Sequence, residues 1–135
     1  MLNCSIPTGL RLVIPFKLHP PLGPAKGNCT WFAYGRLREL GYSTSDLNKL
    51  NGDAKHWDDL AVSAQIPVDK TPTVGAIAQF NGRRNHVAVV EKVNADGTIV
   101  ISESSYAPGS KSWDFLYRTR TIAASSVDNF IHVRR

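Results

Sequence analysis

The chain has few cysteines, no long apolar run and no dense block of charge of one sign. Its two cysteines, Cys4 and Cys29, are too few for a disulfide framework, and no CxxC or Cys/His cluster has the spacing of a zinc site. No apolar run approaches the ~20 residues of a membrane-spanning helix. The first residues also lack the basic and apolar regions of a secretory signal. We therefore expect reduced thiols, no bound metal, no membrane partner, and synthesis in the cytoplasm without a signal peptide.

The formal net charge of +5 is spread along the 135 residues. Such a charge is compatible with nucleic acid, an anionic surface or an acidic polymer as a partner. Arg118-Thr119-Arg120 and Arg134-Arg135, however, lack the interleaved aromatics of a platform that binds single strands. We interpret most arginines as solvated surface charge and expect no nucleic-acid partner. With 42% hydrophobic and 20% charged residues, the chain is typical of one globular domain, and we expect a monomer.

Two segments differ in their residue pattern. Residues 1–25 form a proline-rich arm, in which a long helix is excluded and Leu10–Phe16 fits a short strand or an extended segment. Residues 26–135 form the expected globular domain. There we predict a helix from Asn28 to Leu40 closed by Gly41, turns over Tyr42–Asn51, a helix capped by Asp53, a loop between Pro67 and Pro72, and strands at Val74–Phe80, His86–Val93, Thr98–Glu103, Phe115–Thr121 and Asn129–Val133. Helices followed by antiparallel strands predict an α+β fold with a sheet of about five to six strands.

Cys29 falls in the first turn of the predicted helix, where unpaired N–H groups and the helix dipole favour thiolate over thiol. A thiol there is a candidate nucleophile if a histidine can act as its base. Among the four histidines, His86 fits best, because it begins a strand at the rim of the sheet, where a side chain can face a packed helix. The hairpin around Asn94–Gly97 then places Glu103 opposite Ala88, on the face of His86. A register slip of one residue would move Glu103 to the other face.

Each of these residues taken alone usually has a structural role. A lone buried cysteine packs as a small hydrophobe, and Trp31, Trp57 and Trp113 are more often packing residues than ligand platforms. Acyl transfer by a thiol needs a nucleophile, a base, an orienting group and oxyanion donors. Cys29, His86 and Glu103 together supply the first three, which favours this chemistry.

Five segments, taken in order, carry a resemblance to a known family. They are Asn28-Cys29-Thr30-Trp31-Phe32, Trp57 after Asn51-Gly52-Asp53-Ala54, Pro72–Ala78, His86–Glu91 and Ile101–Glu103. Over residues 26–133 the chain resembles the CHAP domain, a cysteine, histidine-dependent amidohydrolase/peptidase, of the kind found in phage endolysins.

The resemblance implies a papain-like fold and hydrolysis of an amide bond in bacterial peptidoglycan, by an N-acetylmuramoyl-L-alanine amidase or an endopeptidase. It implies that Cys29 is the nucleophile, His86 the general base and Glu103 the orienting acid, without a cofactor. Peptidoglycan is then the expected partner, and the positive charge would also attract anionic wall polymers. The protein would act on the cell wall in phage lysis or as a component of a virion.

Three departures from the family pattern concern the site. Ser105 stands where the family often has Asn, and Asn85 precedes the histidine in place of Gly; with Asn28 they are candidate auxiliary residues. The stretch Leu22–Gly27 has no carboxylate where some phage members bind calcium, so we predict no calcium site there. Three aromatic residues are candidates for substrate binding, namely Trp31, Tyr106 and Trp113.

Two other functions stay open at this point. One is a catalytically silent wall-binding or virion structural module with the same fold. The other is a thiol amidase that acts on a small substrate. Neither the bond that is cut nor a phage or bacterial origin follows from the residues.

Overall fold

The computed structural model describes residues 12–13, 29–82, 85–104 and 116–135. Within these ranges the helices are α1 (Cys29–Glu39), α2 (Thr44–Leu47), the 3-10 helix η2 (Ala54–His56), α3 (Trp57–Ser63) and the 3-10 helix η4 (Ala124–Ser126). The strands are β1 (Leu12–Val13), β2 (Val68–Asp69), β3 (Ile77–Phe80), β4 (His86–Val93), β5 (Thr98–Ser104), β6 (Leu116–Ala123) and β7 (Asn129–Ile131). Three α-helices thus precede the long strands, which confirms the predicted α+β class.

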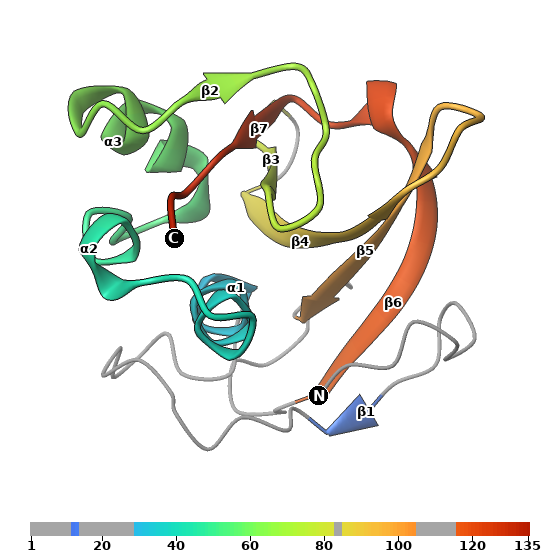
Figure 1. Cartoon of the computed structure of the whole chain (residues 1–135), viewed down its shortest axis with the longest axis horizontal. Helices are drawn as coiled ribbons and strands as arrows, with labels where there is room; N and C mark the ends of the chain where they lie inside the picture. The colour runs from blue at the N-terminus through green and yellow to red at the C-terminus, as the bar shows by residue number, and fades with distance from the viewer. Residues whose placement is uncertain (1–11, 14–28, 83–84, 105–115) are drawn as a thin grey trace.

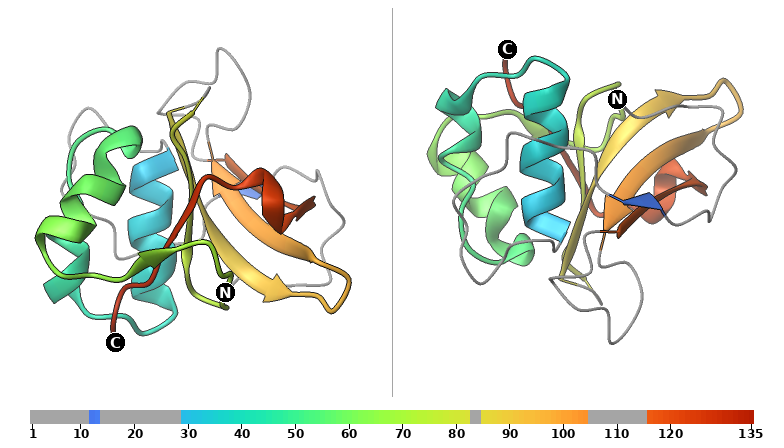
Figure 2. Two further views of the ribbon diagram at one scale, coloured as in Figure 1. Left: turned by 90° about the horizontal axis from the view of Figure 1, so that it is seen from above. Right: turned by 90° about the horizontal axis from the view of Figure 1, so that it is seen from below.

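The strands of the described ranges form one sheet in the order β1-β6-β5-β4-β3-β7-β2. Every neighbouring pair is antiparallel. The three α-helices lie together on one side of the β3–β4 pair, and β5 and β6 curve away from them (Figures 1 and 2). The central strand of the sheet is therefore β4, the strand that begins with His86.

Helix α1 ends next to Gly41, as its sequence predicts. The N–H of Gly41 donates to the carbonyl of Arg38, and the N–H of Tyr42 donates to that of Leu37. Gly41 has a φ of +94°, which a residue with a side chain rarely adopts. These two bonds are the Schellman arrangement that ends many helices. In the part of the chain that the structure describes, no helix is both long and apolar enough to cross a membrane.

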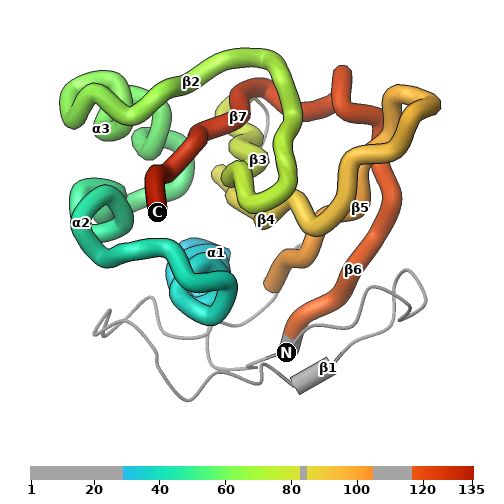
Figure 3. The backbone as a smooth tube through the Cα atoms, viewed as in Figure 1, coloured from blue at the N-terminus to red at the C-terminus, as the bar shows by residue number. Residues whose placement is uncertain are grey.

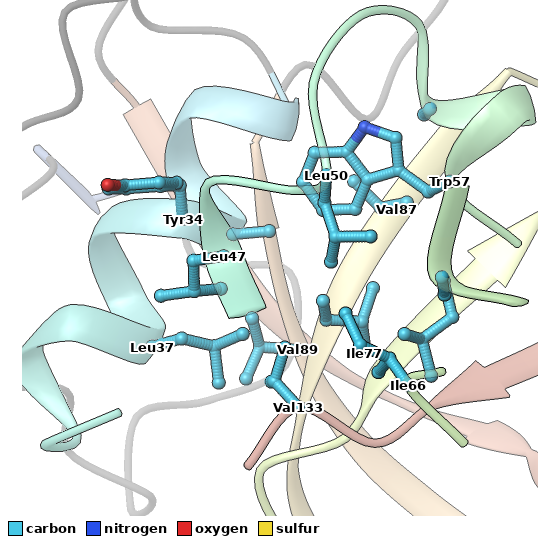
Figure 4. Close-up of a cluster of buried hydrophobic side chains, with 14 of the residues drawn as sticks. Tyr34, Leu37, Leu47, Leu50, Trp57, Ile66, Ile77, Val87, Val89 and Val133 are labelled. Atoms are coloured by element: carbon cyan, nitrogen blue, oxygen red, sulfur yellow. The ribbon is translucent and has the colours of Figure 1, made fainter. Parts of the chain in front are cut away.

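Buried side chains form a cluster on each face of β4. The cluster between the helices and the sheet includes Leu37, Leu47, Trp57, Val87 and Val89 (Figure 4). The cluster on the other face includes Ala78, Ala88, Val90, Ile101 and Phe130. Full burial of a side chain of the size of Val or Leu contributes about 1.5–3 kcal/mol. The first cluster therefore holds α1 firmly against β4.

The β4–β5 hairpin contains one extra residue. Near the turn, Val93 faces Ile99 and Lys92 faces Val100. Farther from the turn, Val90 faces Ile101, so no residue of β5 faces Glu91, which forms a β-bulge. Because side chains alternate along a strand, Val90 and Ile101 point to one face of the sheet, and the residues next to them in each strand point to the other face. The bulge therefore decides which residues of β5 share a face with the start of β4.

Two short elements differ from the prediction. Helix α2 lies within Tyr42–Asn51, where only turns were expected. Strand β2 lies between Pro67 and Pro72, where a loop was expected, and pairs with β7 through Val68 and Ile131. Both elements are too short for a periodic pattern to reveal them. The chain after β7 runs back toward α2 (Figure 3).

Strand β3 begins later than predicted. The N–H of Ala76 donates to the carbonyl of Thr73, which closes a turn over residues 73–76. Gly75 in this turn has a φ of +89°. An ideal Cβ at Gly75 would lie 2.0 Å from the hydroxyl of Tyr42, so glycine is also required there by space. The apolar pattern from Val74 onward therefore belongs partly to a turn.

Candidate active site

Cys29 is the first residue of α1 and has 8% of its surface exposed. Its helix packs against β4 and β5, the strands that carry the predicted base and acid. The N-terminal end of α1 lies at the same end of the sheet as the start of β4 and the end of β5 (Figure 2). The first N–H groups of a helix have no carbonyl one turn earlier, and the helix dipole adds partial positive charge there. This environment favours the thiolate form of a cysteine.

His86 and Glu103 form a hydrogen bond in the interior of the protein. Nε2 of His86 lies 2.8 Å from Oε1 of Glu103, and the two residues are 1% and 0% exposed. Val89 faces Ser102, and the next step of this register places Glu103 opposite Ala88, as predicted. The acid is then diagonal to His86 on the same face, a spacing that long side chains can bridge.

Glu103 is also bound by two arginines from β6. Nε of Arg118 donates to its Oε2 at 2.8 Å, and Nε of Arg120 donates to the same oxygen at 2.5 Å. Burial alone would raise the pKa of Glu103. The hydrogen bonds and charges of His86 and Arg120 outweigh burial, and they lower the pKa to about 2. Glu103 is therefore a carboxylate at neutral pH, and because a carboxylate only accepts, the proton of this bond lies on Nε2 of His86.

The interpretation of these arginines as solvated surface charge was wrong. The side chains of Arg118 and Arg120 are 24% and 25% exposed, and both point to a fully buried acid. Arg118 faces Glu103 directly across the β5–β6 pair, and Arg120 follows two residues later on the same face. The alternating Arg-Thr-Arg sequence was the available signal, but it identifies a face of a strand only once the partner strand is known.

A second buried ion pair joins α1 to β4. Arg36 donates from Nε and Nη2 to the two carboxylate oxygens of Glu91, each at 2.8 Å. Both side chains are almost fully buried, Glu39 also pairs with Arg36, and Ser102 donates to Glu91 at 2.6 Å. Burial alone would lower the pKa of Arg36, but its bonds with Glu91 raise it. Arg36 is thus a third arginine wrongly interpreted as solvated surface charge, and its partner Glu91 is the bulge residue.

Asn85 is exposed and contacts the chain before α3. Its Oδ1 accepts a hydrogen bond of 2.8 Å from the N–H of Lys55. This bond joins η2 to the residue that precedes His86. The Phe80 ring lies beside the imidazole on the neighbouring strand, with 5.7 Å between the ring centroids. Both contacts restrict the position of His86.

The other predicted site residues divide into two groups. Trp31 is 2% exposed, so its ring packs in the interior and offers no surface to a substrate. Asn28, Ser105, Tyr106 and Trp113 lie outside the described residues, as does the stretch Leu22–Gly27. Over the described ranges, no three His, Cys, Asp or Glu side chains are grouped so that they could hold a metal ion.

The fold and this geometry define an α+β domain with a thiol at a helix start and a buried His–Glu pair on the adjoining strands. The model of one protein family, the CHAP domain, matches residues 20–105. The chain belongs to the CHAP domain family.

Several staphylococcal proteins are similar to this chain. The Staphylococcus aureus protein named "Probable autolysin LDP" is 43% identical over 109 residues, which are 80% of this chain and 36% of that protein. The "N-acetylmuramoyl-L-alanine amidase sle1" of Staphylococcus epidermidis is 39% identical over 111 residues, with 78% of this chain and 32% of that protein covered.

A solved structure has the same fold. The crystal structure of an N-acetylmuramoyl-L-alanine amidase from Staphylococcus aureus superposes with a TM-score of 0.64 at 36% identity, and the match covers 80% of this chain and 31% of that one. The papain-like α+β fold is thereby confirmed. The chain spans about a third of the length of these relatives.

Proposed function

We propose that the chain is a thiol hydrolase that cleaves an amide bond in bacterial peptidoglycan. The observation that carries this proposal is the buried hydrogen bond between His86 and Glu103, on the strands against which the Cys29 helix packs. A base held by an acid, on strands that pack against a helix beginning with a thiol, is an arrangement that can activate a cysteine nucleophile. The names of the relatives support peptidoglycan as the substrate.

The proposed mechanism assigns one step to each group. Because Nε2 of His86 donates to Glu103, its Nδ1 is the atom that takes the proton from the Cys29 thiol. The thiolate attacks the amide carbonyl, and a helix-terminal N–H such as that of Cys29 stabilises the oxyanion. The C–N bond then breaks as His86 returns the proton to the leaving amine. Water hydrolyses the resulting thioester, which breaks the C–S bond and restores the thiol.

The bond between N-acetylmuramic acid and L-alanine is the proposed point of cleavage, because two of the relatives are named for it. Mass spectrometry of fragments released from peptidoglycan of known structure tests this. An amidase releases stem peptides with a free N-terminal alanine and glycan with a free lactyl carboxyl. An endopeptidase instead creates new termini within the peptides or cross-bridges, and that result would correct the bond while keeping the chemistry.

The control for hydrolysis uses a Cys4→Ser variant, in which Cys29 is the single thiol. Treatment with iodoacetamide should abolish fragment release while the protein still sediments with cell walls. A protein that releases nothing before alkylation but sediments equally would be a silent wall-binding module. A protein that cleaves only small amides would be the small-substrate amidase.

We further propose that residues 26–135 act as the catalytic unit, that residues 1–25 are an arm, and that the protein works as a monomer at the cell wall. The charge of +5 supports attraction to anionic wall polymers. This attraction is screened by salt over about 10 Å at 0.1 M ionic strength. Fragment release from walls rich in anionic polymer should therefore fall as NaCl is raised, and release from purified, polymer-free peptidoglycan should fall much less. Equal salt dependence on both substrates would remove the polymer from the proposal.

A further inference from the structure

Three charged or titratable side chains meet at the Glu103 carboxylate. Its Oε1 bonds to Nε2 of His86 at 2.8 Å, and Nη2 of Arg120 lies 3.4 Å from the same oxygen. Its Oε2 accepts from Nε of both Arg118 and Arg120. The carboxylate is fully buried, whereas each arginine side chain is about three-quarters covered. The Glu103 carboxylate thus binds two guanidinium cations in addition to the imidazole.

This arrangement changes what Glu103 does for His86. A buried carboxylate with one imidazole partner would attract a proton to that ring strongly, because a lone negative charge stabilises the imidazolium. Here two guanidinium groups more than balance the carboxylate charge. A proton added to His86 therefore enters a cluster that is already positive.

We propose that Arg118 and Arg120 are positioning residues, which hold the Glu103 carboxylate in place and reduce the attraction that it exerts on a proton at His86. The imidazole is then oriented by the acid without being held as a permanent imidazolium. A neutral ring is what a general base needs before it accepts the thiol proton. This inference rests on the proposed role of His86, but its test does not depend on hydrolysis.

Other titratable groups lie on two helices that contact β4, the strand of His86. Cys29 begins α1, and Lys55 and His56 lie on η2, which contacts β4. None of these three groups is a carboxylate, and Glu103 is the acid that the structure shows bonded to His86. Removal of a guanidinium should consequently act on His86 through this one acid and through its own charge.

The test is an NMR titration of the His86 ring in a Cys29→Ala background, with the resonance assigned by a His86→Gln variant. Arg120→Gln and Arg118→Gln should each raise the pKa of His86, by on the order of one unit for a cation lost at this range. Arg120→Lys keeps the charge and should leave the pKa close to that of the parent. Arg134→Gln is the matched control, because its partner is Asp46 on α2, and it should cause no shift.

Three results would overturn the proposal. One is an unchanged pKa of His86 in folded Arg→Gln variants. Another is an equal shift in Arg120→Lys, which would indicate a packing effect. The third is a failure of both Gln variants to fold, which would assign the pair a structural role alone. Failure of the hydrolase proposal would appear separately, as absence of fragment release by the unmodified protein.

Discussion

Replacement of Cys29 by Ala is expected to lower the release of peptidoglycan fragments by on the order of a thousandfold or more, because the proposed mechanism takes its attacking electron pair from the Cys29 thiol. Cys29→Ser keeps a nucleophilic atom of weaker reactivity and should retain at most a small part of the rate. The measurement is the initial rate at which new amino termini are released from purified walls. A Cys29→Ala protein that releases fragments at the normal rate would contradict the assignment of the nucleophile.

The same variant should stay folded. Cys29 belongs to the cluster between helices and sheet, and loss of one sulfur atom there costs about 1 kcal/mol. Thermal unfolding of Cys29→Ala should thus resemble that of the parent, which separates lost chemistry from lost structure. Cys4→Ser is the matched control for the other thiol and should keep its activity.

Replacement of Glu91 by Gln is expected to reduce the free energy of unfolding by about 3 kcal/mol, at the lower end of the range for breaking a buried ion pair. The reason is that Arg36 stays buried without its bidentate acid, while Glu39 offers only partial compensation. Urea denaturation followed by circular dichroism measures this loss.

Two further variants make this result specific. Asp46→Asn removes the acid of a more exposed pair with Arg134 and should cost far less. The double variant Arg36→Met with Glu91→Leu should recover much of the loss, since apolar residues can replace a buried pair. A Glu91→Gln protein that unfolds at the urea concentration of the parent would mean that the pair contributes nothing.

The sequence predicts the strongly periodic parts of this fold well. The bounds of β4 agree to the residue, because its apolar segment Val87–Val90 and Val93 lie between a polar loop and an Asn-Ala-Asp-Gly turn. Gly41 identifies the end of α1 through a backbone requirement that other residues meet poorly. By contrast, β2 has two residues and depends on its pairing with β7, which no local pattern contains.

The candidate site is predictable in its chemistry but not in its electrostatics. Cys29, His86 and Glu103 follow from local context together with one hairpin. The arginine partners of Glu103 depend on the pairing of β5 with β6, and residues 105–115 separate these strands in the chain. The predicted register placed Glu103 on the correct face of the sheet, although it did not include the bulge at Glu91. No residue pattern in the strand indicates that bulge.

The bulge at Glu91 shifts the pairing of β4 with β5 by one residue, and so changes which side chains of the two strands share a face. If the pairing next to the turn continued without it, Glu103 would face Val89, and the base and acid would be out of phase on opposite sides of the sheet. Glu91, the bulge residue, is bound through both carboxylate oxygens by Arg36, which lies on the same helix as Cys29. Helix α1 therefore carries the thiol and also binds the bulge that puts its two proposed partners, His86 and Glu103, on the same face of the sheet.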